Sequence, residues 1–298
     1  MTAERKSEDR FSEVRRTLII VLFLNLLVAV LKTAWGYWTN AISMQADGFH
    51  SFLDAAASGV GLIGVWVASH PPDDTHPYGH RKFETFASFL ISVFLFVGCF
   101  EILKNSYHRF RDAAIPEVTP VSFAIMLVTI AVNFTVSRWE KRKGESLKSE
   151  VLIADSYHTK SDIYASLSVM VSLAFGRAGY PLIDPLVGVV IAFIVGKIGA
   201  QILMESSKVL TDYSRIHPRE IRGLVMDIDG VEECHAVRTR GSQNHIYVDL
   251  HIHVHPHMRL EHAHALSHRV ESEIMKKFSE VVEVVVHLEP HIPELEND

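Results

Sequence analysis

The chain has 298 residues, of which 48% are hydrophobic, a formal net charge of −6 and 18 histidines. The acidic balance and the lack of a basic stripe argue against a nucleic-acid partner. The two isolated cysteines, Cys99 and Cys234, do not make a disulfide framework. The polar, acid-containing N-terminus MTAERKSEDRFSEVRR leads us to expect no cleavable signal peptide.

Long apolar stretches dominate the first two thirds of the chain. A helix needs roughly 20 largely apolar residues to cross a bilayer. Six segments meet this length, some with polar residues tolerated: 16–38, 41–69, 83–107, 117–138, 147–176 and 182–206. A stack of buried helices in a soluble protein is the alternative, and it fits six such runs poorly.

Basic residues predict the orientation of these segments. Lys and Arg gather before the first segment, after the second and after the fourth, where the predicted loop reads SRWEKRKGESLKSE. This bias places both termini in the cytoplasm of a multi-pass protein of the cell (inner or plasma) membrane, surrounded by membrane lipid. We therefore predict a cytoplasmic tail at 1–15, a six-helix transmembrane domain at 16–206 and a cytoplasmic domain at 207–298.

The last part of the chain changes its periodicity. The stretch 217–230 predicts a short helix ended by Gly230, and 231–240 and 244–256 alternate apolar and polar residues as strands do. Helical spacing returns at 259–278, and the β-branched run 280–290 predicts a closing strand. The order αββαβ indicates a small α+β sandwich related to the ferredoxin-like arrangement.

Two of the membrane segments carry the same stripe of ionisable residues. Both stretches, ADGFHSFLD and ADSYHTKSD, have the pattern D-x-x-H-x-x-x-D, whose members share one face of a helix. The residues are Asp47, His50 and Asp54 in the second segment and Asp155, His158 and Asp162 in the fifth. Ionisable groups are costly in lipid, so matched stripes predict a functional site. The alternative is that they pair with each other and with Lys32 or Lys160 to hold the helices together.

A four-ligand metal site follows if the two helices run antiparallel with their stripes facing. One nitrogen and one oxygen from each helix suit a tetrahedral divalent cation, and Zn²⁺ fits best. The ligands would be His50, Asp54, His158 and Asp162. Asp47 and Asp155, one turn toward each helix N-terminus, would orient a histidine or lie on the path of access.

With these motifs, the chain resembles the cation diffusion facilitators, a family of divalent-metal/proton antiporters. The resemblance covers essentially the whole chain and also includes YGHRKFE before the third segment and DPLVG in the sixth. It implies that the four ligands form the transport site. A histidine at position 50 resembles the zinc-transporting branch, since manganese-transporting relatives tend to have a carboxylate there.

The resemblance also implies sites outside the membrane helices. Some members bind a second metal in the loop, which here matches Asp73, His76 and His80, although Asp74 departs from the pattern; the alternative is a solvated polar loop. Lys82 and Asp212 match a charge interlock at the dimer interface.

A binuclear zinc site of the cytoplasmic domain is the third implication. It matches His235, His251, His264, His287 and Glu289, with Glu289 in place of an expected aspartate. The remaining histidines are expected on the surface, and Cys234, beside His235, is expected to point to the opposite face.

The function expected from these features is proton-coupled efflux of Zn²⁺ by a homodimer. Zn²⁺ would be the substrate and a structural or regulatory ion of the cytoplasmic domain, with no organic cofactor and no enzymatic activity. Three alternatives stay open: transport of Cd²⁺, Fe²⁺, Co²⁺ or Mn²⁺, a non-transporting metal sensor or scaffold, and an intramembrane zinc hydrolase. The sequence contains no H-E-x-x-H motif for the last of these.

Overall fold

The computed structural model describes residues 3–38, 42–112, 120–177 and 183–292, together with the side chains of most of them. The chain divides into two compact units, Met1–Ser207 and Lys208–Asp298, each with its own hydrophobic core. The first unit is helical and the second is an α+β domain.

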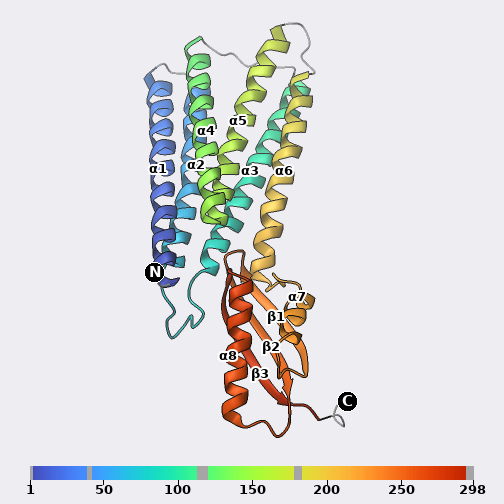
Figure 1. Cartoon of the computed structure of the whole chain (residues 1–298). Coiled ribbons are helices and arrows are strands. Elements are labelled where there is room, and N and C mark those ends of the chain that lie inside the picture. The colour runs from blue at the N-terminus through green and yellow to red at the C-terminus, as the bar shows by residue number, and fades with distance from the viewer. Residues whose placement is uncertain (1–2, 39–41, 113–119, 178–182, 293–298) are drawn as a thin grey trace. The chain divides into compact units, whose positions relative to one another are not determined.

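Six long helices form the first unit, and Figure 1 shows them side by side as a bundle. They are α1 (Ala3–Trp38), α2 (Ile42–Ala68), α3 (Lys82–Asp112), α4 (Pro120–Leu147), α5 (Glu150–Arg177) and α6 (Ile183–Leu210). α2 runs antiparallel to α5, because Gly61 lies against Val151 whereas Asp54, earlier on α2, lies against His158, later on α5. The two polar stripes can therefore meet.

The outer surface of the bundle is apolar, as a lipid-facing surface must be. Phe23, Phe100 and Phe193 are examples of large apolar side chains that are exposed. Four segments of the described chain are long and apolar enough to cross a membrane: Asp9–Trp38, Lys82–His108, Phe123–Leu147 and Pro185–Leu210. Within the described residues, α2 contributes a shorter apolar helical stretch, Asp54–Ala68. The unit is a helical transmembrane domain.

The predicted basic loop after the fourth segment is wrong, because most of it is helix. α4 continues to Leu147, and the chain then turns at Lys148, whose φ is 47°, before α5 begins at Glu150. Lys, Arg and Glu have high helix propensity, and Lys141 and Glu145 add an i,i+4 pair at 3.7 Å. The positive charge that suggested a loop instead lies on the end of a helix.

A half-buried arginine, Arg10, joins the start of α1 to this turn. The Arg10 guanidinium donates to both carboxylate oxygens of Glu84 on α3, at 2.9 and 3.0 Å, and to the carbonyls of Leu147 and Lys148, at 2.8 and 3.0 Å. The Ser149 hydroxyl donates to Glu84 at 2.6 Å. The last carbonyl of α4 and the one that follows it thus accept from a side chain, so Arg10 links α1, α3, the end of α4 and the turn.

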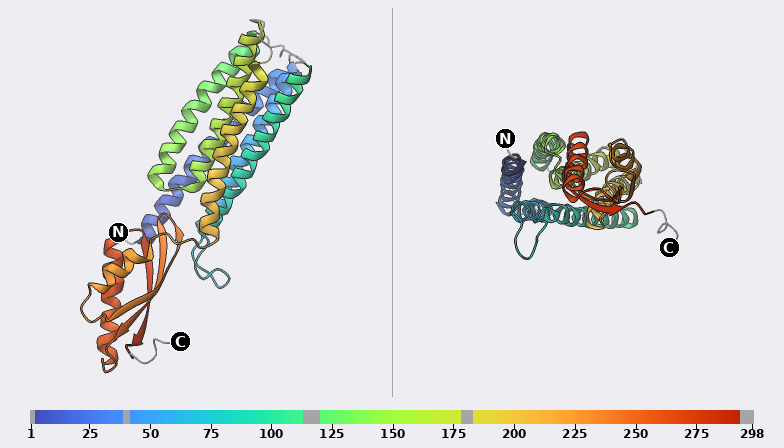
Figure 2. Two further views of the ribbon diagram at one scale, coloured as in Figure 1. Left: turned by 90° about the vertical axis from the view of Figure 1, so that its right-hand side faces the viewer. Right: turned by 60° about the horizontal axis from the view of Figure 1, so that its bottom comes forward.

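The second unit has the predicted element order αββαβ. Its elements are α7 (Pro218–Met226), β1 (Glu233–Ser242), β2 (His245–Val254), α8 (Leu260–Lys277) and β3 (Val281–Pro290). The strand order is β1-β2-β3, with β1 antiparallel and β3 parallel to β2. Both helices lie on one side of the sheet (Figure 2) and bury Ile221, Val270 and Ile274 against it. The opposite face of the sheet is polar.

The first helix of this unit ends earlier than predicted. α7 stops at Met226, and Asp227 follows as its C-cap. Gly230, expected at the helix end, instead has a φ of 101° within the turn that leads into β1. The sequence Asp-Ile-Asp-Gly has the composition of a turn, which explains why the helix does not continue.

The alternation of β2 separates a core face from a histidine face. Ile246, Val248, Leu250, Ile252 and Val254 are buried, whereas the residues between them are half-buried. On β1, Cys234 is buried in the core, as predicted, so its neighbours point to the polar face. The strand then has a β-bulge between His235 and Arg238, where Ala236 has a φ of 49°.

Candidate metal centres

The stripes of α2 and α5 converge inside the helical bundle. His158 Nε2 lies 3.4 Å from Asp54 Oδ1, and ligand atoms of Asp54, His158 and Asp162 all lie within 4.8 Å of one another. Asp54 comes from α2, and the other two residues are one turn apart on α5. His158 is buried, and the two carboxylates are mostly shielded from solvent. These donors have the chemistry and the proximity of a divalent-cation site.

Of the remaining stripe residues, the structure describes the side chain of Asp155 but not those of Asp47 and His50. The side chains of His50 and Asp47 lie outside the described residues, although their backbone is part of α2. Asp155 is fully buried on α5, one turn before His158. Lys32 is also buried and donates to the Ser51 hydroxyl at 3.1 Å, which contributes a positive charge between α1 and α2.

The loop between α2 and α3 holds a second cluster. His80 Nε2 and His76 Nδ1 each lie 3.5 Å from an oxygen of Asp73. His80 Nδ1 is 3.2 Å from the Pro71 carbonyl, which can only accept. His80 Nδ1 can therefore donate to this carbonyl, and in the neutral ring the Nε2 lone pair would then face the carboxylate, an arrangement that a cation would stabilise.

Asp73 is held ionised by the turn that it closes. Its Oδ1 accepts from the His76 amide at 2.6 Å and from the Thr75 amide and hydroxyl at 2.9 and 2.8 Å. These hydrogen bonds, the one from the His76 backbone first, lower the pKa of Asp73 from 3.8 to about 2. The carboxylate is thus available as a ligand across the physiological pH range.

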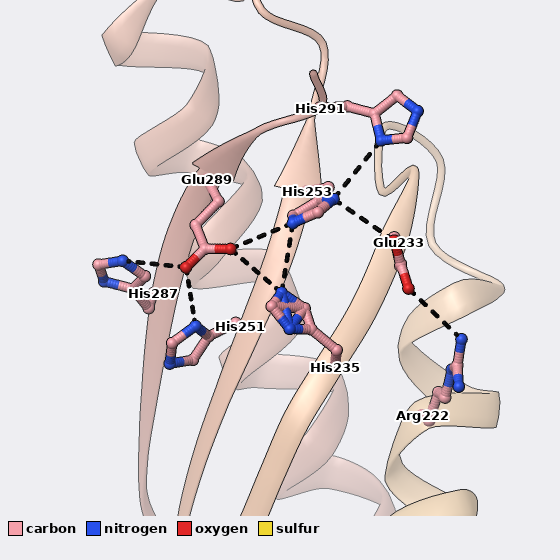
Figure 3. Close-up of polar contacts among 8 residues, drawn as sticks. All are labelled: Arg222, Glu233, His235, His251, His253, His287, Glu289 and His291. Carbon is pink, nitrogen blue, oxygen red and sulfur yellow. Dashed lines mark hydrogen bonds and ion pairs between the residues drawn. The ribbon is translucent and has the colours of Figure 1, made fainter. Parts of the chain in front are cut away.

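A larger cluster covers the polar face of the sheet in the second unit (Figure 3). Glu289, on β3, has its two oxygens directed to different pairs of histidines. Oε1 lies 2.9 Å from His251 Nδ1 and 3.4 Å from His287 Nε2. Oε2 lies 3.1 Å from both His235 Nε2 and His253 Nε2. A carboxylate shared in this way has the geometry of a bridge between two metal ions.

The protonation of Glu289 agrees with a ligand role. Burial works in the opposite direction, but hydrogen bonds from His251 and His253 outweigh it and lower the pKa of Glu289. The side chain is therefore a carboxylate at neutral pH. The register explains the grouping, because His235 is opposite His251 on β1 and β2, and His251 is opposite His287 on β2 and β3.

One predicted ligand of this cluster lies elsewhere. His264 is on α8, on the other side of the sheet, and its Nε2 lies 3.2 Å from that of His268. Conversely, His253 belongs to the cluster although it was expected to be a surface residue. Its position on the same strand face as His251 is the signal that could have identified it.

The proposed interlock residues belong to different compact units. Lys82 begins α3 in the first unit, and Asp212, with a φ of 54°, follows α6 in the second.

A helical membrane domain with a buried His/Asp donor set, followed by a small domain rich in metal ligands, defines a metal-ion transporter. The sequence matches the model of the cation efflux transmembrane domain over residues 18–211 and that of the cation efflux protein cytoplasmic domain over residues 214–291. The chain belongs to the cation diffusion facilitator family. It is therefore a multi-pass membrane transporter of metal cations and not an enzyme.

Relatives span most of the chain. An uncharacterized transporter of Methanocaldococcus jannaschii is 32% identical over 268 residues, which cover 87% of this chain and 94% of that protein. The manganese efflux system protein MneP of Bacillus subtilis is 25% identical, with 97% of this chain and all (100%) of that protein covered. Metal tolerance protein C1 of Arabidopsis thaliana is 28% identical over 88% of this chain, and the match spans 59% of the plant protein.

Solved structures resemble a small part of the chain. A structure of the MamM CTD has 24% identity and a TM-score of 0.24, and covers 25% of this chain and 91% of its own. A cytosolic domain of a cation diffusion facilitator family protein has 25% identity and a TM-score of 0.23, with 24% of this chain and 86% of its own covered.

Proposed function

We propose that this transporter exports Zn²⁺ from the cytoplasm in exchange for protons, and that the α2–α5 cluster is its transport site. The observation that supports the proposal is the convergence of Asp54, His158 and Asp162 at mid-helix in the bundle. A buried group of two carboxylates and an imidazole is costly unless a cation or protons occupy it. Alternate occupancy by a metal ion and by protons is what an antiporter requires.

His50 is the proposed fourth ligand, because it precedes Asp54 by one helical turn on the same face. Two imidazoles and two carboxylates suit tetrahedral Zn²⁺, whereas Mn²⁺ favours oxygen donors. Export of Mn²⁺ is the second candidate, because MneP and MneS of Bacillus subtilis are described as manganese efflux system proteins. We place Zn²⁺ first because of the histidines.

Proton coupling follows from the ligand chemistry. A histidine must be neutral and an aspartate ionised to bind a metal, so metal binding displaces protons. Protonation of His50 or His158 from the outside would then release the ion, since an ordinary imidazole titrates near pH 6.5. Asp47 and Asp155, one turn away, would orient these histidines or guide the ion to them.

For the architecture, we propose six spans with both termini in the cytoplasm of the cell membrane. The boundaries would be 1–15 for the tail, 16–206 for the membrane domain and 207–298 for a ferredoxin-like cytoplasmic domain. We propose that two copies assemble through these domains into a homodimer, with Lys82 and Asp212 forming a charge interlock. Dimerisation would also allow His264 of a second copy to reach a metal centre that it does not reach within one chain.

The clusters outside the membrane helices are proposed as regulatory metal sites. Glu289 would bridge two Zn²⁺ ions in the cytoplasmic domain, with histidines 235, 251, 253 and 287 as the other ligands. Bound metal would favour a tighter dimer and so shift the transporter between its conformations. Asp73, His76 and His80 would hold a further ion in the loop.

Transport in proteoliposomes with an imposed pH gradient tests the proposal. The wild-type chain should couple Zn²⁺ movement to proton flux, and Asp54→Ala or Asp162→Ala should abolish both. Glu13→Gln is the matched control, because Glu13 is an exposed carboxylate paired with Lys143. Flux retained in either aspartate variant would refute the site. Competition with Mn²⁺ would reveal the preferred ion, and faster Mn²⁺ transport would favour the second candidate.

A further inference from the structure

A third group of metal donors lies beside the Glu289 cluster and shares one histidine, His253, with it (Figure 3). It consists of Glu233, His253 and His291, whose ligand atoms lie within 4.8 Å of one another. His253 Nδ1 is 3.5 Å from Glu233 Oε2 and 3.5 Å from His291 Nδ1. The family resemblance assigns no metal to these three residues.

Backbone hydrogen bonds hold all three donors in place. Glu233 and His253 are directly opposite each other in the β1–β2 ladder, and the Glu232 amide donates to the His253 carbonyl at 2.9 Å. After β3, the His291 amide donates to the Val254 carbonyl, also at 2.9 Å. The donors thus come from the adjacent ends of the strands, where little chain movement is needed to close around an ion.

The spacing suits ligands around an ion better than it suits hydrogen bonds. A good N–H···O hydrogen bond has a heavy-atom distance of about 2.9 Å, shorter than the 3.5 Å found here. Two ligands at about 2.0 Å from a tetrahedral Zn²⁺ are separated by about 3.3 Å. In addition, a single proton on His253 Nδ1 can be donated to only one of its two neighbours at a time.

The surroundings leave the group accessible and its carboxylate oriented. Side-chain exposure is 16% for His253 and 30% for Glu233, so an ion can enter from solvent. Arg222 Nη2, from α7, lies 3.7 Å from Glu233 Oε1. Because the guanidinium holds that oxygen, Oε2 remains directed toward the histidines.

We propose that Glu233, His253 and His291 form a third metal locus of the cytoplasmic domain, for a divalent ion that accepts imidazole and carboxylate ligands, such as Zn²⁺, Co²⁺ or Ni²⁺. His253 connects this locus to its neighbour. Its Nδ1 faces the new locus, and its Nε2 faces His235 and Glu289. A neutral imidazole offers one lone pair, so an ion at the third locus withdraws His253 from the Oε2 side of Glu289.

The number of ions bound tests this inference, and the inference does not depend on the transport proposal. The metal-stripped full chain in detergent is dialysed against Zn²⁺, and metal per chain is measured. His291→Ala should lower the count by one ion. Glu233→Gln, which keeps the side-chain shape, should weaken the affinity for that ion by about tenfold or more. The control His262→Ala, which removes an exposed histidine of α8, should leave the count unchanged.

The same change is then made in a Glu289→Gln chain, where the bridged pair is disabled. Adding His291→Ala to that chain should still remove one ion. An unchanged count in His291→Ala with unchanged affinity in Glu233→Gln would overturn the proposal. So would a Glu289→Gln chain in which His291→Ala has no effect, because the residues would then serve the bridged pair alone.

Discussion

Replacing Arg10 with alanine should destabilise the membrane domain far more than replacing a surface lysine. Arg10 makes four hydrogen bonds, two to Glu84 and one each to the carbonyls of Leu147, at the end of α4, and Lys148, in the turn. The side chains of Arg10 and Glu84 are only 12% and 8% exposed. The variant leaves a buried carboxylate with the Ser149 hydroxyl but without its guanidinium, and leaves two carbonyls to be solvated by water.

The magnitude follows from the burial of the pair. Removing one partner of a buried ion pair costs about 3–5 kcal/mol, because the other charge remains desolvated. Some water can reach the site, so we expect about 3 kcal/mol for Arg10→Ala. For a domain of this size, that corresponds to a fall of roughly 6–12 °C in Tm. Lys143→Ala breaks the exposed pair with Glu13, at 3.1 Å, and should cost less than about 1 kcal/mol.

The assay is thermal unfolding of the purified full chain in detergent, followed by circular dichroism. A double-mutant cycle with Glu84→Gln isolates the pair: the double variant should lose much less stability than the sum of the single variants. The reasoning would be refuted if Arg10→Ala lowered the Tm no more than Lys143→Ala, or if the two changes at positions 10 and 84 were additive.

Two further predictions concern pH and backbone strain. Because the pKa of Asp73 is lowered from 3.8 to about 2, its stabilisation of the loop should be complete above pH 4 and lost as the pH falls toward 2. Chemical shifts of the Thr75 and His76 amides should report that low midpoint, and a midpoint near 4 would contradict it. Ala236→Gly should stabilise the cytoplasmic domain by up to about 1 kcal/mol, since the φ of 49° at Ala236 costs a residue with a Cβ. A lower unfolding temperature in this variant would count against strain at the bulge.

Candidate ligands that follow the regular spacing of one helix or one strand could be identified from the sequence. Asp54, His158 and Asp162 were found because two helices carry the same spacing, and their proximity requires only that the helices be antiparallel. His251 and His287 likewise follow from strand periodicity. His253 shares the strand face of His251 and could have been identified in the same way, whereas the position of His291 depends on which strand ends lie side by side, which periodicity within one strand does not contain.

The errors in the fold have a similar origin. The end of α4 was predicted as a loop from its charge, yet Lys, Arg and Glu are good helix formers, and the turn is set by the Arg10 joint. The family resemblance implied His264 as a ligand of the cytoplasmic cluster, and within one chain α8 places it across the sheet from that cluster. Local pattern predicts the face of an element, whereas the neighbour of that face is decided by tertiary packing.

The bulge in β1 has a consequence for how the metal face tolerates change. Before it, Cys234 faces the core, and after it, Thr239 and Gly241 do, so the extra residue reverses the parity of the strand. If the same ten residues paired without the bulge, Cys234 and Thr239, five positions apart, would lie on opposite faces, and only one half of the strand could keep its core face. Keeping Thr239 inside would turn Glu233 and His235 toward the helices. Keeping Cys234 inside would instead turn Thr239 and Gly241 to the polar face. The bulge thus lets both halves of one short strand share a core face, and deletion of its extra residue should keep that facing, because Cys234 and Thr239 would then be four positions apart.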